Sequence, residues 1–218
     1  EEGLAGLTFV CNPPNMAPFG ARAAGVHNSP VAIAVPGKVR EPLVLDMATS
    51  VAAGGKVSLA VDKGVPIPLG WALDSEGRPT TDATLAKILL PAGGYKGSGL
   101  AMMFECLSSL MAGNPLLEPT LLGGPAVRPG TQNSVVAAID IAAFTDLEEY
   151  KAHVDCLIDG IKALPLAEGF TEIVMPGEPE RRVRAERERD GIPLPAGTCA
   201  NLREAAAKLG IPCPPELA

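Results

Sequence analysis

The chain has few aromatic residues, few histidines and no excess of positive charge. Aromatics make up 4% of its 218 residues, and the only histidines are His27 and His153. The five scattered cysteines form no Cys-x-x-Cys pair, so the common zinc spacings are missing and we expect no metal site. The net charge of −7 disfavours a general attraction to nucleic acid or to an anionic membrane.

Long apolar runs are also missing. No uncharged apolar run reaches the length of about 18 residues that a membrane span requires. Free cysteines of this kind are typical of a reducing compartment, which makes the cytoplasm the expected location.

Short apolar runs alternate with helical patterns along the chain, and this alternation indicates the α/β class. Thr49 or Ser50 could cap the first helix. Because the strand runs are continuously apolar, we expect strands of a sheet that is covered on both faces. The predicted strands cover 6–11, 31–35, 42–47, 135–141 and 173–175, and the predicted helices cover 48–62, 99–112, 147–164, 180–190 and 198–210.

A glycine-rich turn over residues 93–99 contains Lys96 and Ser98 and leads into a helical pattern. Backbone N–H groups at such a helix start, together with a lysine, can hold a phosphate or a carboxylate. The turn matches neither a Walker loop nor a Gly-x-Gly-x-x-Gly fingerprint. The alternative is a helix start in which glycine serves only close packing.

Leu-Leu-Pro-Ala-Gly-Gly-Tyr-Lys-Gly-Ser-Gly-Leu at 89–100 resembles a segment of the malate/L-lactate dehydrogenase family that lacks a Rossmann fold. That family includes ureidoglycolate and sulfolactate dehydrogenases, diketogulonate reductase and piperideine-2-carboxylate reductases. Further blocks agree in the same order, at 16–20, 42–50, 70–82 and 175–180.

The resemblance implies a mixed sheet flanked by helices that binds a nicotinamide cofactor, with a small-molecule substrate and a homodimeric assembly. Residues 1–218 would form one cofactor-binding domain, in which 180–210 could pack as a C-terminal extension. Family members are longer at the N-terminal side. We therefore expect a fragment, a processed piece or a defined domain that lacks the helical N-terminal region completing the substrate pocket.

The resemblance also implies three cofactor-binding segments. Glu178 in the third segment would repel a 2′-phosphate, so NAD is preferred over NADP. The implied contacts are Pro42, Leu43, Val44, Leu45, Asp46, Met47 and Ala48 in the first segment, Tyr95 and Lys96 in the second, and Pro176, Gly177 and Glu178 in the third.

Two charged residues have open roles. Asp46 ends an apolar strand, where a buried carboxylate is costly unless it is paired. It could cap the helix that follows near Thr49, or it could line the site and orient a proton donor, which the resemblance favours. Arg22 could clamp a substrate carboxylate, but a surface arginine is an equally good interpretation.

Hydride transfer to a carbonyl requires a proton donor, which is usually a histidine. His153 lies within a helical pattern and His27 in a turn, and neither belongs to the family's Ser-His-Gly motif, which is missing from this chain. Relatives commonly show Gly-Thr-Asn-Pro where this chain reads His27-Asn28-Ser29-Pro30. The expected donor therefore lies outside the chain.

The sequence thus predicts an NAD(P)-dependent oxidoreductase that acts on a small 2-hydroxy or 2-oxo acid, or on a cyclic 2-imino acid. Asp46 would have a supporting catalytic role. One alternative is a non-catalytic or truncated cofactor-binding subunit. Another is an anion-binding enzyme of a different class that uses Lys96 as a nucleophile.

Overall fold

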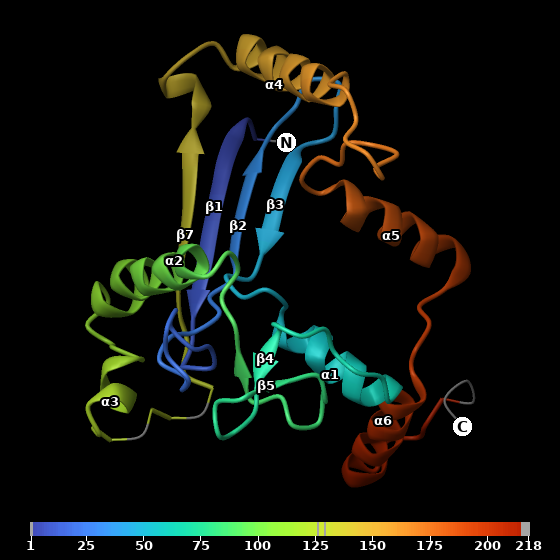
Figure 1. The fold of residues 1–218 in the computed structure, drawn as a ribbon. Coiled ribbons are helices and arrows are strands. Elements are labelled where there is room, and N and C mark those ends of the chain that lie inside the picture. Colours follow the sequence, from blue (N-terminus) through green and yellow to red (C-terminus); the bar gives the residue numbers. More distant parts are fainter. Residues whose placement is uncertain (1, 126, 129, 215–218) are drawn as a thin grey trace.

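The computed structural model describes residues 2–125, 127–128 and 130–214. Its main element is a four-stranded sheet with the order β3-β2-β1-β7, in which each described pair of neighbours is antiparallel (Figure 1). Parallel pairing among the described residues is limited to an isolated bridge between Met16 and Leu89. The strands are β1 (Leu4–Cys11), β2 (Val31–Val35), β3 (Leu43–Met47) and β7 (Asn133–Asp140).

Helices cover one face of this sheet. Phe9 of β1 stacks on Phe104 of α2 (Tyr95–Glu105), with ring centroids 4.5 Å apart. A π-helix (Cys106–Leu110) continues α2 and contacts β1 and β7. At the other end of the same face, α4 (Leu147–Lys162) supplies Val154 and Ile158 to a cluster that includes Val35 and Leu43.

The opposite face of the sheet is open. Directly paired residues share a face, and the register places Asp46, Ala32, Thr8 and Val136 in one row across the four strands. Val136 is 81% exposed. The expectation of strands covered on both faces is therefore wrong for β3 and β7, because α2 and α4 both pack on the same side.

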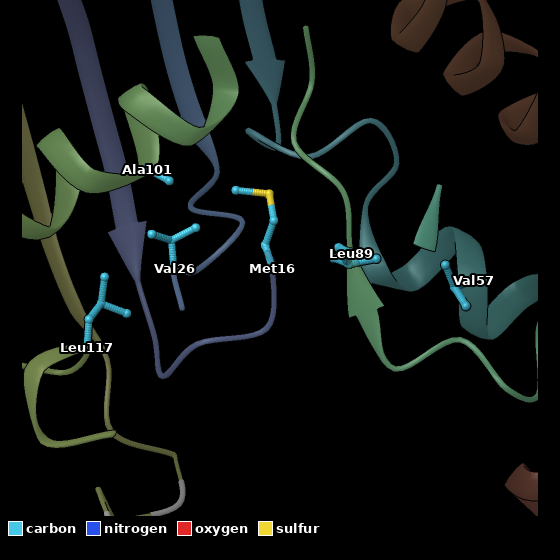
Figure 2. Close-up of a cluster of buried hydrophobic side chains, with 6 residues drawn as sticks. All are labelled: Met16, Val26, Val57, Leu89, Ala101 and Leu117. Carbon is cyan, nitrogen blue, oxygen red and sulfur yellow. The ribbon is translucent and has the colours of Figure 1, made fainter. Parts of the chain in front are cut away.

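A second, three-stranded sheet forms a smaller lobe next to α1 (Gly54–Lys63). Its strands are β4 (Ala72–Leu73), β5 (Pro79–Thr80) and β6 (Ile88–Leu89). One buried cluster joins this lobe to α2 and to the loop between β1 and β2 (Figure 2). Its members are Met16, Val26, Val57, Leu89, Ala101 and Leu117.

Several element boundaries differ from the predicted ones. The helix predicted over 48–62 begins at Gly54, and its N-cap Ala53 offers no side-chain cap, so Thr49 and Ser50 do not cap it. Helix α2 begins at Tyr95, four residues earlier than predicted, because the positive φ angles of Gly93 and Gly94 complete the turn before it. Residues 173–175 form no strand.

Between the π-helix and β7 lies the short helix α3 (Glu118–Leu121), and residues 126 and 129 of this stretch lie outside the described part. After β7 comes a 3-10 turn, Ile141–Ala143.

The C-terminal part runs from the end of α4 back to the smaller lobe (Figure 1). Helix α5 (Glu178–Asp190) has no buried residue, and α6 (Ala196–Leu209) packs on α1. The hydroxyl of Thr198 donates to Asp62 at 2.6 Å. The expected class, sheets flanked by helices, is confirmed. Within the described residues, none of the helices combines the length and the apolar character needed to cross a bilayer.

Candidate functional site

Two of the three predicted cofactor segments meet at the free edge of β3. Because β3 is the edge strand, its outward N–H groups are not used by the sheet. The N–H of Val44 donates to the carbonyl oxygen of Pro176 at 3.2 Å. The turn Pro176–Gly177 therefore lies directly along this strand.

A cavity of about 280 Å³ opens between the two segments. On the strand side it is lined by Val44, Leu45 and Asp46. On the other side it is lined by Val174, Met175, Pro176, Gly177, Pro179 and Glu180. We refer to it below as the edge cavity.

Glycine at position 177 permits this close approach. Gly177 has a φ of +89°, a conformation that other L-residues rarely adopt. A Cβ there would lie 3.2 Å from the carbonyl oxygen of Val44 and 2.8 Å from the guanidinium of Arg181. A side chain at this position would be strained by the φ angle and would require Arg181 and the turn to shift.

Asp46 lies on the open face of the sheet and is exposed. In the described part of the chain its carboxylate has no hydrogen bond and no ion pair, so it caps neither α1 nor another helix. Because Asp46 is exposed, its carboxylate does not carry the desolvation cost that its apolar neighbours in the sequence suggest. The structure instead leaves Asp46 free to accept hydrogen bonds inside the edge cavity.

The second predicted segment, Tyr95 and Lys96, lies just beyond the end of β3 and does not line the edge cavity. The N–H of Ala92 donates to the carbonyl oxygen of Thr49 at 2.9 Å, which holds the start of α2 beside the residues that follow β3 (Figure 1). Tyr95 and Lys96 are exposed in the first turn of α2. Among the described contacts, Lys96 makes no ion pair.

Ser98, expected to offer a hydroxyl at the same place, is engaged elsewhere. Its Oγ accepts the N–H of Phe19 at 3.1 Å, and it is buried. The rings of Phe19 and Tyr95 meet edge to face, with centroids 6.3 Å apart. The start of α2 is therefore fixed to the loop after β1, and Lys96 is the group in this turn that remains free for an anion.

Glu178 does not face the edge cavity. Its carboxylate accepts the N–H of Met175 at 3.0 Å and pairs with Lys162 at 2.9 Å. The Met175 N–H, and then Lys162, hold the pKa of Glu178 below its usual value. Arg182 lies 3.7 Å from the same carboxylate. A charge neutralised in this way would not repel a 2′-phosphate, so the argument for NAD from Glu178 fails.

Arg22 lies apart from the edge cavity. Its backbone and Cβ pack against Gly77 in the smaller lobe, and its side chain is exposed. Its assignment as a substrate clamp stays a prediction.

Neither histidine lines the edge cavity. His27 is 7% exposed, and burial lowers its pKa to about 4. Its Nδ1 lies 3.4 Å from the hydroxyl of Ser29. His153 is exposed on α4, with its Nε2 3.6 Å from Glu149. At neutral pH, His27 is therefore an uncharged core residue that lies away from the edge cavity.

The pattern of residues did not reveal two further features. The side chains of Asn15 and Asn28 form a pair, in which Asn28 Oδ1 accepts from Asn15 at 2.9 Å and Asn28 N donates to Asn15 at 2.8 Å. Asn28 also donates to Ser50 at 3.3 Å and accepts the N–H of Thr49, so this network positions the chain beyond β3. The second feature is Glu180, which lines the edge cavity, although the sequence pattern indicates only the start of a solvated helix. Its closeness in sequence to the Pro176–Gly177 turn is the signal that could have identified it.

In the described ranges, no group of three or more His, Cys, Asp or Glu side chains could hold a metal ion. What the site offers is an apolar groove beside a strand edge, two free carboxylates and a lysine at a helix start. This combination suits a ligand with both hydroxyl and phosphate groups.

Comparisons with known proteins identify the family of this chain. The malate/L-lactate dehydrogenase family matches residues 1–203. The NADP(+)-dependent (2R)-3-sulfolactate dehydrogenase of Chromohalobacter salexigens is 36% identical, over 93% of this chain and 59% of its own length. The NAD(+)-dependent ureidoglycolate dehydrogenase of Escherichia coli O157:H7 is 32% identical, over 88% of this chain and 55% of its own.

The structure of sulfolactate dehydrogenase from Methanocaldococcus jannaschii superimposes with a TM-score of 0.73 at 36% identity, covering 96% of this chain and 60% of that one. The chain thus spans about three fifths of the length of such relatives. The match over residues 1–203 shows that the chain belongs to the malate/L-lactate dehydrogenase family.

Proposed function

We propose that this chain forms the cofactor-binding part of an NAD(P)-dependent oxidoreductase. Its substrate would be a small 2-hydroxy or 2-oxo acid, or a cyclic 2-imino acid. The observation that carries the proposal is the edge cavity, because two segments about 130 residues apart meet there through the Val44–Pro176 hydrogen bond. Relatives named as dehydrogenases of sulfolactate and ureidoglycolate support the class of reaction.

The residues at this edge fit a dinucleotide. Gly177 lets the turn lie close against Val44, and the apolar side chains of Val44 and Pro179 line the groove. Lys96 at the start of α2 would neutralise phosphate charge. When bound, the nicotinamide would supply or accept the hydride. The edge cavity beside β3 would hold one part of the cofactor, and Lys96, beyond the end of β3, would hold another.

A non-catalytic or truncated cofactor-binding subunit is the second candidate, and one observation favours it. Among the described residues, neither histidine is placed to donate a proton, since His27 is buried and His153 lies on the outer side of α4. General acid–base help typically contributes about 10²–10⁴ in rate. Without a donor, the chain would bind cofactor and turn over very slowly.

Binding and turnover distinguish these candidates. Titration with NADH and NADPH, followed by cofactor fluorescence, tests binding, and the absorbance of the reduced cofactor with a panel of 2-oxo acids and cyclic imines tests turnover. Saturable binding supports the proposal, and no binding of either cofactor overturns it. Turnover of about 1 s⁻¹ or more lies in the normal enzyme range and would exclude the non-catalytic candidate. Binding without turnover would support that candidate.

We also propose that two copies assemble as a homodimer, as family resemblance implies. Sedimentation of the purified chain at several concentrations tests this assembly. A purely monomeric chain at high concentration would contradict it.

A further inference from the structure

Glu178 and Glu180 point to opposite sides of the β3 edge. Residues two positions apart on a helix do not face the same way. Glu178 lines a cavity with Leu43 and Ile158 on the helix-covered side of the sheet, and its charge is neutralised there. Glu180 lines the edge cavity together with Val44 and Asp46, on the open side.

The charged side chains that line the edge cavity are all negative. Asp46 and Glu180 are the charged residues that line it, both are exposed, and in the described structure neither has an ion pair or a hydrogen bond. Arg181, on the same helix, donates to the carbonyl oxygen of Pro42 at 3.1 Å and lines the other cavity. The charged side chains that line the edge cavity are therefore two free carboxylates, and the guanidinium of Arg181, beside Gly177, is held by Pro42.

Free carboxylates accept hydrogen bonds from hydroxyl groups and repel phosphates. The free lysine, Lys96, lies beyond the other end of β3, at the start of α2. The diphosphate of a dinucleotide should therefore lie toward Lys96, and an uncharged ribose should occupy the edge cavity. The diphosphate joins the two riboses of the cofactor, and the adenosine ribose is the one whose 2′-position distinguishes NAD from NADP.

We propose that Asp46 and Glu180 bind the ribose diol of the adenosine and select NAD over NADP by repelling the 2′-phosphate. Glu180 is the specificity-determining residue. The proposal rests on the proposed function, because it assumes that a nicotinamide dinucleotide binds at this edge. It assigns to Glu180 the role that the sequence pattern suggested for Glu178.

The test is a direct titration of the wild-type protein and of Glu180→Gln with NADH and with NADPH, followed by cofactor fluorescence. The wild-type protein should bind NADH more tightly than NADPH. In Glu180→Gln the NADPH affinity should rise by roughly fivefold or more, the effect of removing one like-charge contact in a water-exposed cavity, while NADH affinity falls slightly. Glu180→Arg should bind NADPH more tightly than NADH.

Glu188→Gln is the matched control. Glu188 lies on the same helix, is exposed, pairs with Arg184 and does not line the edge cavity. Its substitution should leave the ratio of the two affinities unchanged, and thermal unfolding should show that all variants are folded.

Two results would overturn the inference while leaving cofactor binding intact. One is a wild-type protein that binds NADPH at least as tightly as NADH. The other is a Glu180→Gln variant in which both affinities change by the same factor, which would place the residue near the diphosphate or the other ribose. If the wild-type protein binds neither cofactor, the proposed function itself fails, and the inference fails with it.

Discussion

Gly97 in the first turn of α2 lies directly against the carbonyl oxygen of Thr49, the second residue after β3. A Cβ at position 97 would overlap this oxygen and would lie 2.7 Å from the carbonyl oxygen of Ala92. The same Thr49 oxygen accepts the N–H of Ala92. This contact fixes where Lys96 sits relative to β3, and hence the distance between the two ends of the proposed cofactor site.

Gly97→Ala should therefore destabilise the protein by about 2 kcal/mol or more, since backbone atoms, not a flexible side chain, oppose the added methyl. Gly99→Ala is the matched control in the same helix, because a Cβ at Gly99 meets no atom within 4 Å. It should be neutral, or stabilise by up to about 1 kcal/mol. Chemical denaturation measures both, and equal effects of the two changes would contradict the packing role of Gly97.

Lys96→Ala should weaken NADH binding by about 1–3 kcal/mol, the range for a charge-assisted contact, without loss of stability. Lys96 is exposed and its N-terminal helix position tolerates alanine. Lys87→Ala, an exposed lysine outside any helix, serves as the control. Isothermal titration calorimetry measures the affinity, and an unchanged value would remove Lys96 from the site.

Asp46→Asn should change the free energy of unfolding by no more than about 0.5 kcal/mol, because the exposed carboxylate has no partner among the described residues. NADH affinity should fall by roughly 1 kcal/mol or more, since the charged acceptor is lost. With Asp46 at the adenosine ribose, turnover of a catalytically complete protein at saturating NADH should be unchanged, and a large loss of turnover would instead support a role in orienting the proton donor. Unfolding and binding are measured on the same variant. A loss of stability with unchanged NADH binding would show that Asp46 has a structural role and does not bind the cofactor.

His27 should make stability depend on pH. Its pKa is about 4 in the folded protein because of burial, compared with 6.5 for an ordinary histidine. Above pH 6.5 the imidazole is neutral in both states and its contribution to stability is complete. As the pH falls from 6.5 to 4, mainly the unfolded chain takes up the proton, and about 3 kcal/mol of stability is lost.

Chemical denaturation across this pH range checks the effect, with His27→Gln as the comparison. The variant should be less stable at pH 7, because glutamine does not fill the same buried space, but its stability should vary less between pH 6.5 and 4. Parallel curves for the two proteins would show that His27 does not titrate as its burial requires.

The elements could be predicted from the sequence where local pattern decides them. Helix α4 was expected from the spacing of Val154 and Ile158, and the structure confirms it. The runs at 31–35 and 42–47 form β2 and β3, because continuous apolar residues favour extended chain. Glycine before Tyr95 indicates the turn, but the predicted helix start is wrong, since Gly97 and Gly99 are poor helix formers and it is the packing of Gly97 on Thr49 that fixes this end of α2.

The sequence by itself determined the family of the chain, because the motif residues and their order resemble those of one family. It also placed Lys96 in a glycine-rich helix start, which follows from local backbone preferences. Tertiary structure decided which side chains face the edge cavity. Whether Glu178 or Glu180 enters the edge cavity depends on the direction of α5 relative to β3, and the contacts that set it come from Lys162 and Met175. The exposure of Asp46 likewise depends on α2 and α4 packing on one face of the sheet, a choice that no local pattern contains.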